Sequence, residues 1–153
     1  MSSKSVVFYG IKSEFISIAC KLAEKMYSIR EPILFLCDNE EEVDFYNSRL
    51  WTFSRLSFIP SGNKKALPIE DAKFCHVWFS TEIVFYNNPY CLLHNGIDIT
   101  KFGDISSFNK VIDIFDLNLI DNAKARAAYY KNASFLEQKT WVQNDSSWKP
   151  AEL

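Results

Sequence analysis

The chain has 153 residues, a length that suits one domain with a sizeable core and is short for two. Its 17 Lys and Arg against 19 Asp and Glu give a formal net charge of −2, which disfavours a protein whose main task is to grip nucleic-acid phosphates. The sequence contains no run of 18 apolar residues and no secretory leader pattern. The spacing of the four cysteines does not match that of metal ligands. We therefore expect a cytoplasmic protein with buried, reduced thiols, no metal and no membrane contact.

The first part of the chain alternates strand and helix patterns. Residues 6–9 and 33–37 are short, apolar, β-prone runs, and each predicts a buried strand. Between them, apolar residues recur every three to four positions, which predicts a helix that Ser13 caps and Pro32 ends. The acidic run 38–42 is typical of a helix start, since Asp or Asn caps a helix and the dipole favours glutamates in its first turn.

The helix that starts in this acidic run is predicted to extend to about Trp51, and a loop rich in Pro, Gly, Asn and Lys follows over 60–71. Further along the chain we predict three strands, over 74–79, 90–94 and 111–115. A last helix is predicted over 119–133, capped by Asp116 or Asn118.

This alternation predicts an α/β fold. We expect a three-layer, Rossmann-like arrangement in which helices cover both faces of a mostly parallel central sheet. Residues 1–153 are expected to form a single domain that ends in a polar tail from about residue 142 to residue 153.

The turn after the first predicted strand, Tyr9-Gly10-Ile11-Lys12-Ser13, contains one glycine. Neither G-x-G-x-x-G nor G-x-x-x-x-G-K-[ST] occurs there, and without further glycines the backbone cannot curl its amides around a phosphate. We therefore expect no nucleotide-binding loop and no cofactor.

Motifs of catalytic nucleophiles are also missing, since the chain has neither G-x-S-x-G nor H-E-x-x-H. His76 falls inside the third predicted strand, and we interpret it as a hydrogen-bonded structural histidine. His94 ends the fourth predicted strand, where sites gather in α/β folds. A small-molecule-binding protein or enzyme that uses the region of His94 and Asp98 is therefore the alternative function.

Two stretches carry recognisable motifs. In the first, Leu50-Trp51-Thr52-Phe53 is followed by Ser57-Phe58-Ile59-Pro60; in the second, Val111-Ile112-Asp113 leads into a helix with Lys124, Arg126, Tyr130 and Lys131. Their order and spacing resemble the chi subunit family of bacterial DNA polymerase III, in which an L-W-T-F segment precedes an S-F-x-P turn. Together with the opening strand, the resemblance spans nearly the whole chain.

The resemblance implies a Rossmann-like sheet without a nucleotide site, in a non-catalytic accessory subunit of the clamp loader. It implies two partners: the acidic, apolar-ended C-terminal tail of the single-stranded-DNA-binding protein, and the psi subunit or clamp loader. Contact with nucleic acid would then be indirect. A second alternative is that the protein binds single-stranded nucleic acid directly, through the lysines of the 60–71 loop and of the last helix.

A tail that ends in a carboxylate beside an aromatic ring needs a basic side chain next to a shallow apolar pocket. The resemblance assigns this tail site to the last helix and the strand before it: Phe115, Lys124, Arg126, Ala127, Ala128 and Lys131. A second register of the helix against the family would give the key roles to Arg126 and Tyr129.

The psi-docking surface of the family corresponds here to Trp51, Phe53, Phe58 and Pro60. Large aromatic residues are typical interface anchors, but they are equally typical of a core. The sequence leaves both alternatives open for Trp51 and Phe58.

Overall fold

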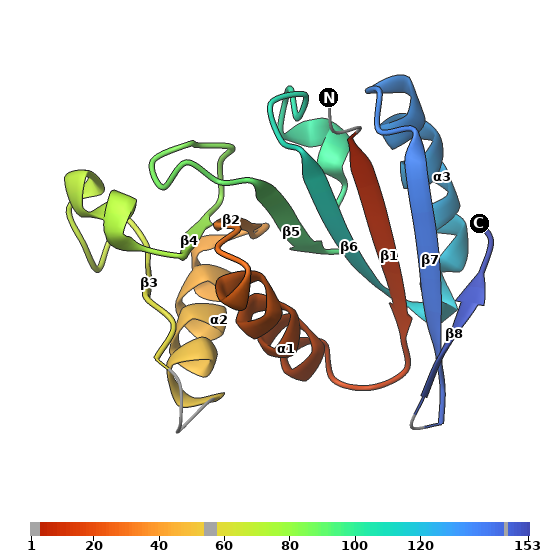
Figure 1. The fold of residues 1–153 in the computed structure, drawn as a ribbon, viewed down its shortest axis with the longest axis horizontal. Helices are drawn as coiled ribbons and strands as arrows, with labels where there is room; N and C mark the ends of the chain where they lie inside the picture. The colour runs from red at the N-terminus through yellow and green to blue at the C-terminus, as the bar shows by residue number, and fades with distance from the viewer. Residues whose placement is uncertain (1–3, 54–57, 146) are drawn as a thin grey trace. The chain divides into compact units, whose positions relative to one another are not determined.

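The computed structural model describes residues 4–53, 58–145 and 147–153. The fold is α/β and Rossmann-like, as predicted, with eight mostly parallel strands and three α-helices in the described residues (Figure 1). The chain folds as two compact units: a terminal unit of Met1–Phe15 and Leu93–Leu153, and a central unit of Ile16–Leu92.

The terminal unit contains five strands, one of which begins in the last residues of the central unit. The strands are β1 (Ser5–Ile11), β5 (Cys91–Asn95), β6 (Lys110–Asp116), β7 (Glu137–Asn144) and β8 (Ser147–Ala151). Helix α3 (Ile120–Asn132) follows a short 3-10 turn, Leu117–Leu119, which Asp116 caps through the backbone amide of Asn118.

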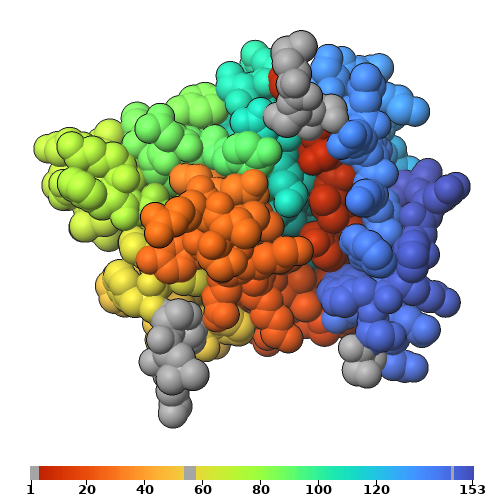
Figure 2. Space-filling model, viewed as in Figure 1, coloured from red at the N-terminus to blue at the C-terminus, as the bar shows by residue number. Residues whose placement is uncertain are grey.

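Strand β1 lies between β6 and β7 and is parallel to both, with Phe8 opposite Asp113 on one side and opposite Thr140 on the other. On the face that carries Phe8, the rings of Phe115 and Tyr130 pack against it, so α3 is fixed to the sheet by aromatic contacts. On the opposite face, β1 reaches the surface as a strip between β6 and β7 (Figure 2).

The central unit contains helices α1 (Phe15–Ser28) and α2 (Glu40–Phe53) and strands β2 (Ile33–Leu36), β3 (Ser61–Gly62) and β4 (Val77–Ser80). Strand β4 pairs in parallel with both β2 and β3. The start of α2 confirms the predicted cap, because Asn39 Oδ1 accepts a hydrogen bond from the backbone amide of Glu42 at 2.9 Å. All four cysteines are buried, reduced thiols, as expected.

Strand β3 lies within the stretch 60–71 that was predicted as a loop, and α3 has Leu119 at its N-cap without a side-chain cap, so the predicted cap by Asp116 or Asn118 is wrong. Two larger parts of the secondary structure also differ from the prediction. The strand predicted over 74–79 begins only at Val77, because residues Ile69–Phe74 form a 3-10 helix. Phe74, which was predicted to be the first residue of that strand, ends the 3-10 helix, and its side chain is 69% exposed. Residues from Ser134 onward, for which we predicted no strand, form β7 and β8, an antiparallel hairpin in which β7 extends the parallel sheet.

The second difference has a clear physical origin. β7 consists mostly of polar residues over Glu137–Asn144, with Trp141 and Val142 as its apolar side chains, and every residue except Thr140 is exposed or half-buried. Polar composition therefore concealed a strand that is only partly covered. No helix in the part of the chain that the structure describes could cross a lipid bilayer.

Candidate binding site

A chain of buried hydrogen bonds runs through the terminal unit and ends on Arg126. His94 Nε2 lies 2.6 Å from the hydroxyl of Tyr130, and that hydroxyl donates to Asp113 Oδ2 at 2.8 Å. Arg126 donates to the same carboxylate through Nε at 2.7 Å and through Nη2 at 3.0 Å. The carboxylate of Asp113 thus accepts three hydrogen bonds, two of them from one planar guanidinium.

The direction of each hydrogen bond in this chain follows from its donors. The backbone N–H of Ile97 donates to His94 Nδ1 at 3.2 Å, so the proton of the neutral imidazole lies on Nε2 and is donated to Tyr130. Burial, and then the charge of Asp113, raises the pKa of Tyr130 well above its usual value. The phenol is therefore a neutral donor to Asp113 at every physiological pH.

Arg126 is 7% exposed, yet its positive charge is compensated by the carboxylate of Asp113. Burial works to lower the pKa of its guanidinium, but the hydrogen bonds and charge of Asp113 outweigh burial and raise it. A guanidinium has five N–H donors, and Asp113 occupies two. The side chain also lines two cavities.

The first cavity, of about 620 Å³, lies at the carboxyl ends of β1 and β6. Its polar wall includes the amides of Asn118 and Asn122, and its apolar wall includes Phe115, Leu117 and Leu119. The second cavity, of about 350 Å³, is formed on the other side of Arg126 by Gly96, Asp98, Thr100, Asn122, Ala125 and Tyr129.

The two cavities differ in charge. The first contains two cations, Lys12 and Arg126, against one carboxylate, Asp116. The second contains Arg126 against Asp98, whose pKa is lowered chiefly by the hydroxyl of Thr100. Because Asp113 already neutralises Arg126, Lys12 balances Asp116 in the first cavity, whereas Asp98 leaves the second cavity with a negative charge. An anionic group is therefore disfavoured less in the first cavity than in the second.

Two glycines shape the walls of these cavities. A Cβ on Gly10 would lie 2.8 Å from the ring of Phe115, so only glycine lets that ring close over β1. Gly96 has φ +56°, and a Cβ there would lie 3.3 Å from Arg126 Nη2. Gly10 thus serves packing around the cavity, and Gly96 lets the guanidinium pass beneath the loop after β5.

The turn after β1, where Rossmann-like proteins hold phosphate, is closed by the chain itself. The backbone amides of Lys12 and Ser13 both donate to Gln143 Oε1, at 2.7 and 3.0 Å. The amide nitrogen of Gln143 in turn donates to the Ser13 hydroxyl at 2.8 Å. These amides cannot also bind phosphate while Gln143 occupies them, which gives a structural reason for the missing nucleotide loop.

The residues predicted for tail binding lie on two sides of α3. Arg126 and Phe115 line the first cavity, and Tyr129 lines the second together with Arg126. Lys124, Ala128 and Lys131 are exposed and line neither cavity, while the carbonyl of Ala127 accepts a hydrogen bond from Gln138. The structure therefore groups Arg126 with Tyr129, the pair named by the second register.

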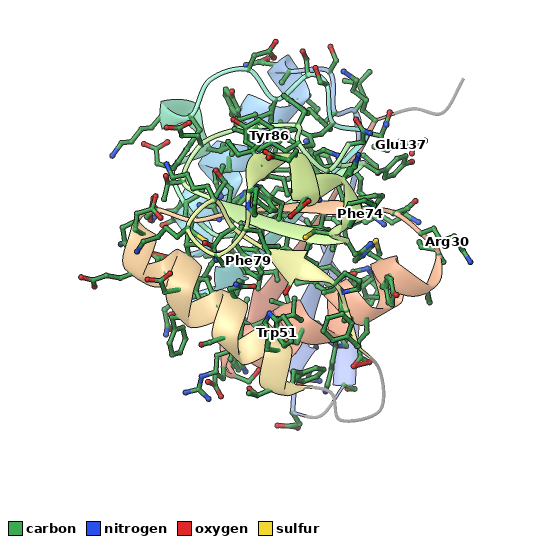
Figure 3. All side chains as sticks on the ribbon, turned by 90° about the vertical axis from the view of Figure 1, so that its left-hand side faces the viewer. Arg30, Trp51, Phe74, Phe79, Tyr86 and Glu137 are labelled. Carbon is green, nitrogen blue, oxygen red and sulfur yellow. The ribbon has the colours of Figure 1, made fainter. Side chains whose placement is uncertain are left out.

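The predicted docking residues of the central unit are largely accessible. Trp51 is 56% exposed and Phe58 is 60% exposed, and their rings contact each other with centroids 5.0 Å apart. Figure 3 views the unit from the side of β3 and shows Trp51 near the end of α2. Phe53 and Pro60 are half-buried, and Ser57 lies outside the described residues. Of the two alternatives for Trp51 and Phe58, the structure supports the surface rather than the core.

Trp51 also borders a shallow groove of about 500 Å³ on the same unit. The groove lies between α2 and residues 63–66, and it is lined by Asp44, Asn47, Ser48, Trp51, Thr52, Asn63, Lys65 and Ala66. Lys65 is paired with Asp44 at 3.3 Å across it. One lysine of the 60–71 loop is thus already neutralised within the chain.

His76 and the cysteines have surroundings that suit structure rather than chemistry. His76 is 7% exposed and packs against the ring of Tyr27, and burial lowers its pKa to about 4. Burial raises the pKa of Cys20 to about 12 and raises that of Cys37 further. A thiol that stays protonated at neutral pH is a poor nucleophile and a poor metal ligand.

Several residues of the site were not found from the sequence. Asn118, Asn122 and Gln143 are isolated amides without a motif, and only folding brings them to the cavity or to the first turn. His94 was singled out at a strand end, but its partners Asp113 and Tyr130 come from a different strand and from α3. The spacing of Arg126 and Tyr130, one helical turn apart, is the signal that could have linked these two residues.

These features define a class of protein: a Rossmann-like domain whose phosphate-binding turn is closed and whose open cavity presents one fixed guanidinium among amide and apolar side chains. A comparison with protein families gives a match over residues 3–138, most of the chain, to the family described as DNA polymerase III chi subunit, HolC. The chain belongs to this family, as its motifs predicted. A comparison with curated proteins gives no match.

Family membership makes the chain an accessory subunit of DNA polymerase III, with a partner in that complex. The match ends near the start of β7, so most of the C-terminal hairpin, including Gln143, lies beyond the matched residues.

Proposed function

We propose that the protein is a non-catalytic, cytoplasmic adaptor that links the clamp loader of DNA polymerase III to the C-terminal tail of the single-stranded-DNA-binding protein. The single observation that carries this proposal is the guanidinium of Arg126, which is held by Asp113 at the border of two cavities. A free carboxylate is the ligand that such a group recognises best.

The first cavity fits the end of such a tail. Lys12 and Arg126 offset the charges of Asp116 and Asp113, so a carboxylate that enters the cavity meets no net negative charge. Beside it, Leu117 and Leu119 offer an apolar wall for the terminal side chain, and the side chain of Leu119 is 53% exposed. Lys124 and Lys131, exposed on the outer side of α3, are placed to attract the acidic residues that precede the terminus.

The exposed pair of Trp51 and Phe58 supports a second surface, for the psi subunit or the clamp loader. Exposed aromatic residues in contact with each other resemble the central anchors of protein interfaces. The tail site belongs to the terminal unit and this pair to the central unit, so the two proposed sites share no residue.

The test is binding of a labelled peptide that copies the tail, measured by fluorescence anisotropy at low and moderate salt. We expect micromolar binding that is lost when the terminal apolar residue is deleted. Asn122→Asp places a carboxylate in the wall shared by both cavities, and it should weaken binding by about tenfold, which corresponds to about 1.4 kcal/mol.

Asn132→Asp is the matched control, since it makes the same change of charge at an exposed position of α3 that lines neither cavity. We expect this variant to bind within a factor of about two of the unmodified protein, because exposed charges at a distance are screened by salt. Equal binding by the two variants would contradict the placement of the tail, and no binding by the unmodified protein would contradict the proposed function.

A further inference from the structure

The proposed function leaves open why Arg126, an almost buried side chain, should serve as a ligand anchor. We infer that His94, Tyr130 and Asp113 are positioning residues that hold the Arg126 guanidinium in one orientation, and that this orientation makes the site specific for a free carboxylate. The inference rests on the proposed function and adds the means by which the site distinguishes a chain terminus from the many side-chain and backbone amides around it.

The orientation of the guanidinium is determined by two contacts at known atoms. Nε and Nη2 of Arg126 both donate to Asp113, and this two-point contact fixes the plane of the group. Nη1 and the second hydrogen of Nη2 are then directed away from Asp113, and the residue lines both cavities. A lysine would keep the positive charge but could not hold this geometry.

The Asp113 carboxylate is itself held in place from behind. The Tyr130 hydroxyl donates to Oδ2, and His94 donates to that hydroxyl. Phe8 and Phe135 pack against the buried ring of Tyr130, with centroid distances of 5.7 and 6.3 Å, and these contacts help to hold the phenol in place. The carboxylate cannot rotate without breaking one of its three hydrogen bonds.

The same chain of hydrogen bonds also fixes the loop that borders both cavities. His94 Nδ1 accepts from the amide of Ile97, which closes the backbone around Gly96. Gly96 lies against Arg126 Nη2 and lines both cavities. One network therefore positions both the anchor and the adjacent wall, so that the anchor needs little reordering when a ligand binds.

The network explains a preference for carboxylate over amide. An amide can offer the fixed guanidinium one neutral acceptor oxygen, and its NH₂ group would face the N–H donors of Arg126. A carboxylate offers two charged acceptors. Because hydrogen bonds to charged groups contribute about 1.5–3 kcal/mol, we expect the unmodified protein to prefer a tail with a free carboxylate over the same tail with a C-terminal amide by roughly tenfold or more.

The experiment compares Kd for these two peptides in three proteins: the unmodified protein, Tyr130→Phe and Phe135→Leu. Tyr130→Phe keeps the ring and removes only the hydroxyl that holds Asp113. Phe135→Leu disturbs the packing of the same ring without removing a polar group, so it controls for loss of stability. We expect the carboxylate preference to fall at least about threefold in Tyr130→Phe and to be unchanged in Phe135→Leu.

A measurement on the unmodified protein does not depend on how the variants fold. In the NMR spectrum, the Nε–H of Arg126 should be resolved and slow to exchange with solvent, because it is bonded to a buried carboxylate. An unchanged preference in Tyr130→Phe, or an Nε–H that exchanges as fast as that of an exposed arginine, would overturn the inference alone. Failure of the unmodified protein to bind either peptide would overturn the proposed function as well.

Discussion

Replacing Asp113 by Asn tests how much the buried network contributes to the fold. The carboxylate is fully buried and accepts hydrogen bonds from Arg126 Nε, Arg126 Nη2 and the Tyr130 hydroxyl. Asparagine has almost the same shape, but it removes the charge and turns one acceptor oxygen into a donor. The Arg126 guanidinium would then be a nearly buried cation without a counter-charge.

Breaking a buried ion pair by removing one partner costs about 3–5 kcal/mol of stability. For a chain of this length the melting temperature falls by about 2–4 °C per kcal/mol, so Asp113→Asn should lower it by roughly 6–20 °C. The free energy of unfolding would be measured by urea titration followed by tryptophan fluorescence and circular dichroism.

Asp116→Asn is the matched control for this variant. Asp116 lies on the same strand, is exposed, and caps the 3-10 turn after β6. Since asparagine caps as well as aspartate does, we expect a change within about 0.5 kcal/mol. A loss below 1 kcal/mol in Asp113→Asn would refute the view that the network is a major source of stability in the terminal unit.

Two further predictions concern stability. Burial lowers the pKa of His76 from 6.5 to about 4 in the folded protein. Between pH 7 and 4.5 the unfolded chain therefore takes up a proton at His76 and the folded chain does not. As the pH is lowered over this range, this group should reduce the free energy of unfolding by about 2 kcal/mol. In urea titrations at the two pH values, His76→Phe should not show this loss of stability. The raised pKa of Glu42 acts with the opposite sign, but it contributes equally to both proteins and cancels in the comparison. An identical fall in stability in the two proteins would disprove the assignment to His76. Ser134 follows α3 with φ +76°, so Ser134→Gly should stabilise the protein by about 0.5–1 kcal/mol. Ala133 has an ordinary φ of −90°, so Ala133→Gly should not stabilise it. Equal effects of the two variants on the free energy of unfolding would exclude backbone strain as the cause.

Much of the fold could be predicted from the sequence because local patterns and burial agree there. The apolar runs at 33–37 and 111–115 lie in strands buried on both faces, and the acidic run after residue 37 is capped by Asn39 as expected. The strand β7 could not be predicted, because most of its residues are polar and its pairing with β1 is a long-range contact. Phe74 was misassigned because an aromatic residue beside an apolar run is read as strand, whereas the chain turns in a 3-10 helix first.

The candidate site was only partly visible in the sequence. Arg126 and Phe115 were named for tail binding and do border a common cavity, and Tyr129 was named in the alternative register. The burial of Arg126 against Asp113 could not be foreseen, since it depends on the register of α3 over β6. The role of Gln143 was hidden for the same reason: the residue is distant in sequence from the turn that it closes.

The central claim is that a carboxylate-ended tail binds beside Arg126 on the terminal unit. The most direct test is an NMR titration of the ¹⁵N-labelled protein with the tail peptide. We expect chemical-shift changes at Arg126 Nε–H, the Asn122 side-chain amide and the Gly96 backbone amide, with the indole of Trp51 unaffected. Changes centred on Trp51, or no change at any of these groups at millimolar peptide, would contradict this claim.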